Sequence, residues 1–172
     1  MCFFLNQQID PKSWSIRYHT RDLSTLSIDT DIGRIHIHNL YNPSPISGGS
    51  TLPALRAAIQ DLSGEHVVIG DFNLHHPLWT RPGYGHAHPE ADKLTGLAAD
   101  YGLQLLLPRG TITYEKHTAD GLQETTINLA WGTHMLGEQL TRCEDQRQWL
   151  HAADHIPILT ELDLSVAQAP EI

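Results

Sequence analysis

Alternation between apolar and polar residues dominates the first 41 positions, and it limits the chain to folds that begin with several β-strands. Successive side chains of a strand point to opposite faces, so a period of two marks a strand with one face buried. In the last of these segments, Ile35 and Ile37 share one face and His36 and His38 the other, which we interpret as exposed. The expected strands cover Cys2–Asn6, Trp14–Tyr18, Leu23–Asp29 and Ile32–Tyr41.

Two predicted helices follow, and each leads into a short apolar strand. Apolar residues at helical spacing predict the first helix, over Leu52–Leu62, and a second is expected over Glu90–Tyr101. Val67–Ile69 and Leu103–Leu107 are apolar throughout, as are strands buried on both faces. This order of elements indicates an α/β or α+β layered sandwich.

Turn residues divide the rest of the chain. Proline and glycine predict loops over 42–50 and 80–89. Asp120-Gly121 is a hairpin signal. The remaining expected strands are Thr111–Glu115, Thr125–Trp131, Gln139–Glu144 and Ile156–Leu164.

Length and composition favour one acidic domain. The 172 residues, 40% of them apolar, suffice for a single core, which we assign to residues 1–164 with a polar tail over 165–172. The net charge of −9 argues against a basic nucleic-acid clamp. Cys2 and Cys143 form no metal or disulfide pattern, which favours a reducing, intracellular compartment. No apolar run reaches the roughly 20 residues of a membrane span, and no signal peptide is recognisable.

Polar residues follow the buried strand Val67–Ile69. Asp71 and Asn73 stand two positions apart in Gly70-Asp71-Phe72-Asn73, so an extended backbone would place a carboxylate beside an amide on one face. Open α/β sheets present ligand groups at such strand ends. The same residue types also form ordinary turns, and that reading stays open.

Four further polar residues stand in or next to other expected strands. The adjacent Asp154 and His155 can bind a cation and transfer a proton, although in a chain with 12 histidines such a pair is also a common surface feature. Asn128 lies inside an apolar strand and needs a partner there. Tyr41 adds a phenol. We expect these strand ends to converge on one site.

Five segments occur together in the order and approximate spacing typical of the endonuclease/exonuclease/phosphatase superfamily, which the chain resembles over nearly its whole length. His75-His76-Pro77-Leu78-Trp79 is similar to the endonuclease domains of LINE-type (non-LTR) retrotransposons, particularly fungal ones. The five segments are Asn39–Pro43, Ile69–Asn73, Gly110–Tyr114, Thr126–Leu129 and Asp154–Ile158.

The resemblance implies a four-layer αββα sandwich that hydrolyses DNA phosphodiesters with Mg²⁺ or Mn²⁺. By position, Asp71 matches the residue that orients or activates the attacking water. Asn73 matches the residue that acts with it in binding the phosphate. His155 and Tyr41 match phosphate-contacting residues, and Asp154 a metal-site carboxylate.

Four further positions receive roles from the resemblance. Asn128 stands where the family normally has an aspartate that orients the histidine. His75, His76 and Trp79 lie on the segment that shapes the DNA-facing rim.

Two departures from the family pattern predict a truncated and impaired nuclease. The family's first strand, helix and strand, which carry an asparagine and the principal metal-binding glutamate, have no counterpart before Asn6. Asn128 cannot stabilise a charged imidazolium as an aspartate does. Missing sheet elements also predict association through an exposed sheet edge.

Two alternatives remain. The chain could be a non-catalytic binding or interaction module derived from a retrotransposon endonuclease, in which case it would bind without a metal. It could also hold zinc through His75, His76, His86 and His88, although their spacing matches no familiar zinc pattern.

Overall fold

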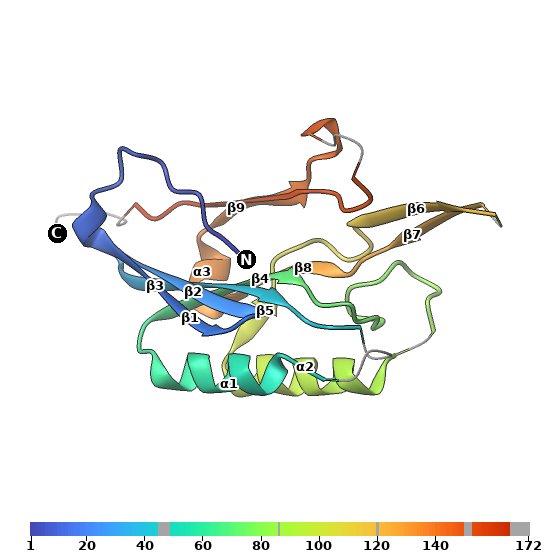
Figure 1. Cartoon of the computed structure of the whole chain (residues 1–172), viewed down its shortest axis with the longest axis horizontal. Coiled ribbons are helices and arrows are strands. Elements are labelled where there is room, and N and C mark those ends of the chain that lie inside the picture. Colours follow the sequence, from blue (N-terminus) through green and yellow to red (C-terminus); the bar gives the residue numbers. More distant parts are fainter. Residues whose placement is uncertain (45–48, 86, 120, 150–152, 166–172) are drawn as a thin grey trace, which may run out of the picture.

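A six-stranded mixed sheet forms the centre of the molecule (Figure 1). The structure, a computed structural model, describes residues 1–44, 49–85, 87–119, 121–149 and 153–165. Only β3 and β4 run parallel; the other neighbouring strands are antiparallel. In spatial order the strands are β1 (Trp14–Thr20), β2 (Leu23–Thr30), β3 (Gly33–Tyr41), β4 (Glu65–Asp71), β8 (Asn128–Thr133) and β5 (Leu103–Leu105).

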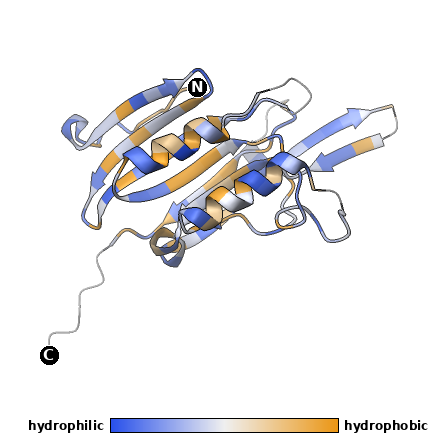
Figure 2. Cartoon of the chain, turned by 90° about the horizontal axis from the view of Figure 1, so that it is seen from below, coloured by the Kyte–Doolittle hydropathy of each residue, from blue (hydrophilic) through white to orange (hydrophobic). Residues whose placement is uncertain are grey.

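Helices α1 (Leu52–Asp61) and α2 (Pro89–Asp100) cover one face of this sheet (Figures 1 and 2). Each begins with a proline in its first turn, where the missing N–H costs no hydrogen bond. Their buried faces join the sheet in the main core, which includes Leu55, Ile59, Leu94, Leu97, Val68, Leu129 and Trp131. Both expected helices are confirmed, as is the mixed α/β class.

Smaller elements lie on the opposite face. Strands β9 (Leu140–Asp145) and β10 (Ile158–Leu162) form an antiparallel pair above the central sheet (Figure 1). An apolar cavity of about 640 Å³ lies between β10 and the sheet. Strands β6 (Tyr114–Thr118) and β7 (Gly121–Thr125) form a projecting hairpin. The remaining elements are α3 (His134–Glu138) and the 3₁₀ turns η1 (Pro11–Ser13) and η3 (Arg147–Trp149).

The expected strand over Cys2–Asn6 is wrong. The segment has no strand partner within the described residues, and Phe4 is 96% exposed. The expected strand Thr125–Trp131 is divided between β7 and β8, because Thr126 and Ile127 form hydrogen bonds to Thr111 and Thr113 outside the sheet ladder. The helix α3 was not predicted.

The expected exposure of His36 and His38 is also wrong, since they are only 2% and 0% exposed. Their face of β3 lies under α1, and neighbouring strands supply polar partners. Ser27 Oγ lies 2.8 Å from His36 Nδ1, and Thr25 Oγ1 lies 2.8 Å from His38 Nδ1. His38 Nε2 lies 3.0 Å from His66 Nδ1. Buried imidazoles are tolerated here because their nitrogens have partners.

A glycine allows β3 and β4 to meet closely at their ends. Gly70 has φ = 145°, and a Cβ there would lie 1.8 Å from the Leu40 carbonyl oxygen. Only glycine accepts both conditions. The close pairing places Asp71 directly beside Tyr41 across the two strands. None of the described helices is long and apolar enough to cross a membrane.

Candidate active site

A cleft of about 570 Å³ lies at the edge of the sheet where β3 and β4 end and β8 begins. Segments far apart in the sequence meet there, as the ends of parallel neighbouring strands do in open α/β sheets. It gathers most of the sequence-predicted site residues, and its lining is Tyr41, Ser44, Asp71, Asn73, His75, His88, Tyr114, Gln123, Thr125, Ile127, Asp154 and His155.

The side chain and backbone of Asn73 hold the carboxylate of Asp71. The Asn73 backbone N–H donates to Oδ1 of Asp71 at 3.0 Å, and its Nδ2 donates to Oδ2 at 3.1 Å. Asn73 adopts φ = 50°, a left-handed conformation that is uncommon outside glycine. Such backbone conformations persist where the surrounding structure fixes them. Asn73 therefore orients Asp71 in this structure.

Asn42 anchors this pair to the fold. It accepts from Nδ2 of Asn73 through its carbonyl oxygen at 2.9 Å and donates from its own Nδ2 to the Phe72 carbonyl at 3.1 Å. Its Oδ1 accepts from the Thr51 backbone N–H at 2.8 Å, immediately before α1. The carboxylate is thus held by β3, β4 and the start of α1 together.

Burial raises the pKa of Asp71, whereas the hydrogen bonds from Asn73 and the charge of His155 act in the opposite direction. A carboxylate with a raised pKa is a better proton acceptor, because it holds the transferred proton more strongly. Asp71 is therefore a fixed and partly desolvated carboxylate.

Asn128 contacts the ring of His155. The Oδ1 atom of Asn128 lies 3.2 Å from Nδ1 of His155, and Nδ2 of Asn128 donates to the Thr113 carbonyl at 3.0 Å. Because the amide nitrogen already donates to Thr113, the amide oxygen faces the ring and accepts from Nδ1–H. The amide therefore supports the tautomer that an aspartate would support, and Nε2 of His155 carries a proton only when the ring is charged.

Tyr114 and Thr113 contribute to the site, although neither was predicted as a site residue. The Tyr114 ring packs edge-on against His155 with centroids 4.9 Å apart. Burial, then the charge of Asp154 and a hydrogen bond to its carboxylate, raise the pKa of the Tyr114 hydroxyl. Thr113 is fully buried and accepts from the backbone N–H groups of Ile127 and Asn128. The segment Gly110–Tyr114 carried the only sequence signal for both.

His75 and His88 form another part of the cleft wall. Burial, and then the nearby His88, lower the pKa of His75, which favours its neutral ring. The His75 ring packs against Tyr84 with centroids 5.4 Å apart. Tyr41 is 44% exposed beside Asp71, so its phenol is open to a ligand.

His76 and Trp79 do not line this cleft. Trp79 is fully buried, donates from its indole N–H to the Leu74 carbonyl at 3.0 Å and packs edge-on against Trp131. This places the ring in the core, out of reach of any ligand, and corrects the expected place of Trp79 on the rim. The His76 ring packs on Trp79, and its Nδ1 accepts from the Leu78 backbone N–H.

Oxygen donors for a hard cation are few here. Across the described part of the chain, no group of three or more His, Cys, Asp or Glu side chains is arranged to hold a metal ion. His86, named in the zinc alternative, lies outside the described residues. Magnesium usually keeps several waters and takes one or two carboxylates plus substrate phosphate. Two carboxylates, Asp71 and Asp154, line the cleft, and Asp154 fits that requirement, since Asp71 is held in place by two hydrogen bonds from Asn73.

A family model described as "Endonuclease-reverse transcriptase" matches residues 35–159. The match includes every residue of the cleft lining. A search of curated proteins finds no match.

Solved nucleases share the fold at low sequence identity. The endonuclease domain of TRAS1, a telomere-specific non-LTR retrotransposon, is 15% identical with a TM-score of 0.72, over 91% of this chain and 72% of that domain. The 3′ phosphatase NExo from Neisseria, bound to a product DNA hairpin, is 16% identical with a TM-score of 0.60, over 83% of this chain and 65% of that chain. An AP endonuclease from Archaeoglobus fulgidus is 16% identical with a TM-score of 0.58, over the same shares.

Proposed function

The chain belongs to the endonuclease-reverse transcriptase family, and from that premise we propose that it hydrolyses phosphodiester bonds in DNA with the help of a divalent cation. The observation that carries the proposal is that Asp71 and His155 line one cleft, each held by its own partner. In-line attack on a phosphodiester needs a positioned water and groups that stabilise charge on the phosphate oxygens. The cleft offers a carboxylate that could position the water and donors that could face the phosphate.

Asp71 acts on the attacking water in this proposal. Its carboxylate accepts the water proton, and Asn73 keeps it aimed by occupying both of its oxygens from one side. Tyr41, exposed beside Asp71, donates a hydrogen bond from its hydroxyl to a non-bridging phosphate oxygen. Asn73 thus serves the phosphate indirectly, through Asp71.

His155 acts on the phosphate in this proposal. Only its charged form has a proton on Nε2, because Nδ1–H is held by Asn128. That charged form donates to the scissile phosphate. A neutral amide stabilises an imidazolium less than a carboxylate does, so we expect catalysis to be slow.

Asp154 is the residue that would hold Mg²⁺ or Mn²⁺, together with waters and phosphate oxygens. The cation would supply neutralisation of the charge that builds up on the phosphate. One protein carboxylate gives a weak grip, so we expect activity to need millimolar metal.

The β6–β7 hairpin lies beside the cleft and is part of the proposed DNA surface. Gln123 and Thr125 of β7 line the cleft directly. Arg81 lies 3.6 Å from Glu124, which joins the loop before α2 to the hairpin. We further propose that β9 and β10 occupy the place of the second sheet in a four-layer αββα sandwich.

The test is nicking of supercoiled plasmid by the full chain with Mg²⁺, with Mn²⁺ and with a chelator. Metal-dependent conversion to the open circle supports the proposal. Nicking that persists in chelator points to a contaminating or unrelated activity.

A second candidate is a non-catalytic module that binds DNA or protein. The apolar cavity of about 640 Å³ between β10 and the sheet favours it, because concave sites lined by apolar side chains commonly bind ligand groups. This candidate predicts oligonucleotide or protein binding that is unchanged by chelator, without strand cleavage.

A further inference from the structure

A second polar pocket of about 280 Å³ lies at the far end of β3 from the cleft. Ser15, Ser27 and His36 stand side by side across β1, β2 and β3 and belong to one face of the sheet. Ser27 and His36 are 7% and 2% exposed, so they form a buried polar floor. A polar floor in a sandwich normally serves either internal pairing or a ligand.

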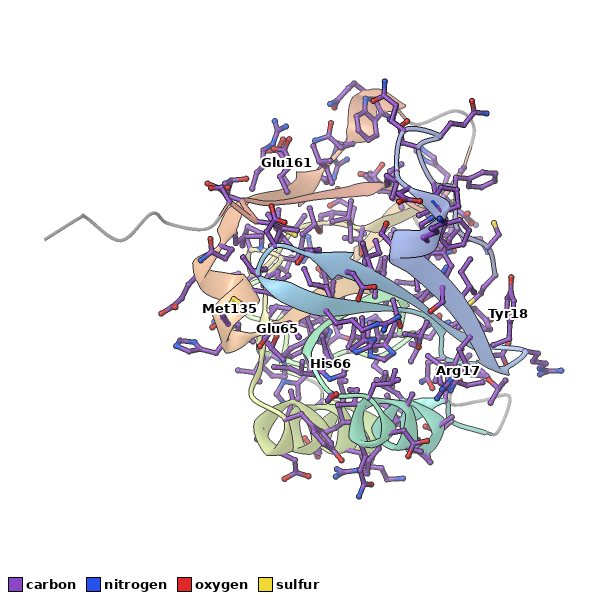
Figure 3. All side chains as sticks on the ribbon, turned by 90° about the vertical axis from the view of Figure 1, so that its left-hand side faces the viewer. Arg17, Tyr18, Glu65, His66, Met135 and Glu161 are labelled. Atoms are coloured by element: carbon purple, nitrogen blue, oxygen red, sulfur yellow. The ribbon has the colours of Figure 1, made fainter. Side chains whose placement is uncertain are left out.

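Two arginines flank this floor. Arg17 and Arg34 each lie two residues from the row of Ser15, Ser27 and His36, on the same face, because strand side chains alternate. Arg34 Nε lies 3.5 Å from Asp29, while its Nη2 lies 3.5 Å from Ser15 Oγ, at the pocket. Arg17 has no hydrogen-bond or ion-pair partner among the residues that the structure describes. Figure 3 labels Arg17, which comes from β1.

The end of α1 forms the opposite wall, through Asp61, Leu62 and Ser63. This wall is fixed in place. His36 Nε2 donates to the Ser63 carbonyl at 3.1 Å, and Gly64 approaches β3 so closely that a Cβ there would lie 2.4 Å from the Arg34 carbonyl oxygen. The pocket is therefore preformed, so a ligand would not have to order it.

We propose that this pocket binds a protonated phosphate group, either inorganic phosphate or the terminal phosphate of a small monoester. Arg17 and Arg34 approach from two sides and can each form paired N–H···O bonds, which guanidinium groups form well with phosphate. The hydroxyls of Ser15 and Ser63 complete the set of donors. The volume leaves room for a small ester group or for waters.

Asp61 gives the pocket its selectivity. A carboxylate and the negative end of α1 disfavour an anion that only accepts hydrogen bonds. A phosphate that carries one proton can donate it to Asp61 while its other oxygens accept from the arginines. Phosphate monoesters lose this proton near pH 6, so much of the ligand carries it at slightly acid pH. Sulfate and phosphodiesters carry none, and the pocket rejects them.

This site is separate from the proposed active site. His36 and Tyr41 lie five positions apart on β3, which corresponds to roughly 17 Å along an extended strand. The two sites share no lining residue. Binding here thus stands whether or not the chain cleaves DNA.

Calorimetric titration of the full chain at pH 6.5 tests the proposal, with inorganic phosphate, glycerol 2-phosphate, dimethyl phosphate and sulfate at matched ionic strength. We expect the first two to bind and the last two to bind at least about tenfold more weakly. If only one of the first two binds, that one is the ligand class. Equal binding of sulfate and phosphate overturns the proposal.

Two substitutions should change anion binding in different ways, one by weakening phosphate binding and the other by strengthening sulfate binding. Arg17→Gln should weaken phosphate binding by at least about tenfold, since it removes a charged donor. Asp61→Asn should strengthen sulfate binding and abolish the preference for phosphate. Arg56→Gln is the matched control, because Arg56 lies on the outer face of α1 and pairs with Asp100. Phosphate binding that survives Arg17→Gln unchanged would place the anion elsewhere, for example in the cleft, and would refute the assignment.

Discussion

Asn128 faces His155 with its amide oxygen 3.2 Å from Nδ1 of the ring, while its amide nitrogen is held by the Thr113 carbonyl. The contact fixes the ring and its tautomer but adds no negative charge. Orientation and charge stabilisation, which one aspartate would supply together, are therefore separated in this chain.

Restoring the charge should speed cleavage. Asn128→Asp should raise the single-turnover nicking rate by at least about tenfold, because a carboxylate stabilises the charged imidazole that donates to phosphate. Asn128→Ala, which removes the contact, should lower it. The melting temperatures of both variants serve as controls, since the bond to Thr113 is lost in each. A rate for Asn128→Asp at or below that of the unchanged chain, with the fold intact, would contradict this role.

Asn73 combines a backbone role with a side-chain role. Asn73→Gly keeps the left-handed backbone, whereas Asn73→Ala does not, so the alanine variant should be less stable by about 1 kcal/mol. Urea unfolding measures this difference. Both variants lose the side-chain bond to Asp71 and should nick DNA at similarly reduced rates. If the two are equally stable, the conformation at φ = 50° carries no strain.

Acid should destabilise the fold through the buried histidines. Burial, then the nearby His66, lower the pKa of His38 to about 3, and burial, then His36, lower the pKa of His66 to about 4. Unfolding returns both to about 6.5. The unfolded chain then binds more protons, so this contribution to stability is complete above pH 6.5 and is lost as the pH falls toward 4 and 3.

The slope of this loss is measurable. Two extra protons bound by the unfolded chain reduce the free energy of unfolding by about 2.7 kcal/mol per pH unit below about pH 5.5. Urea midpoints from pH 7.5 to 4.5 report it. His66→Gln should roughly halve the slope, because it removes one of the two extra protons that the unfolded chain binds. His134→Gln, at an exposed position, should leave the slope unchanged. A midpoint that does not vary with pH would contradict the buried neutral pair.

Trp79 should matter for stability and not for DNA contact. Trp79→Ala should cost about 3–5 kcal/mol, because it leaves a large cavity in the core. Trp79→Phe should retain most of the stability, and the folded protein should bind DNA as tightly as the unchanged chain. A selective loss of DNA affinity in the folded Trp79→Phe variant would argue against the buried position.

The gathering of Tyr41, Asp71 and His155 could be predicted because each follows or precedes a buried strand, and strand ends meet at one edge of a sheet. Apolar residues at helical spacing likewise predicted α1. The hydrogen bonds of Asn73 to Asp71 could not be predicted, since they depend on a left-handed backbone that the sequence of a turn leaves open.

The exposure of His36 and His38 was mispredicted for a different reason. Alternation separates two faces but does not show which is covered, and in β3 both are, since Ile35 is 4% exposed and His36 2%. The position of Trp79 was mispredicted for a similar reason, because the sequence of a loop does not show whether an aromatic ring packs in the core or lies at the surface.

Single-turnover nicking of supercoiled plasmid in millimolar Mg²⁺ tests the central claim most directly, with the unchanged chain compared with Asp71→Asn and His155→Ala. The account predicts slow, metal-dependent nicking that falls at least about 100-fold in each folded variant. Nicking at the same rate in all three proteins would contradict it.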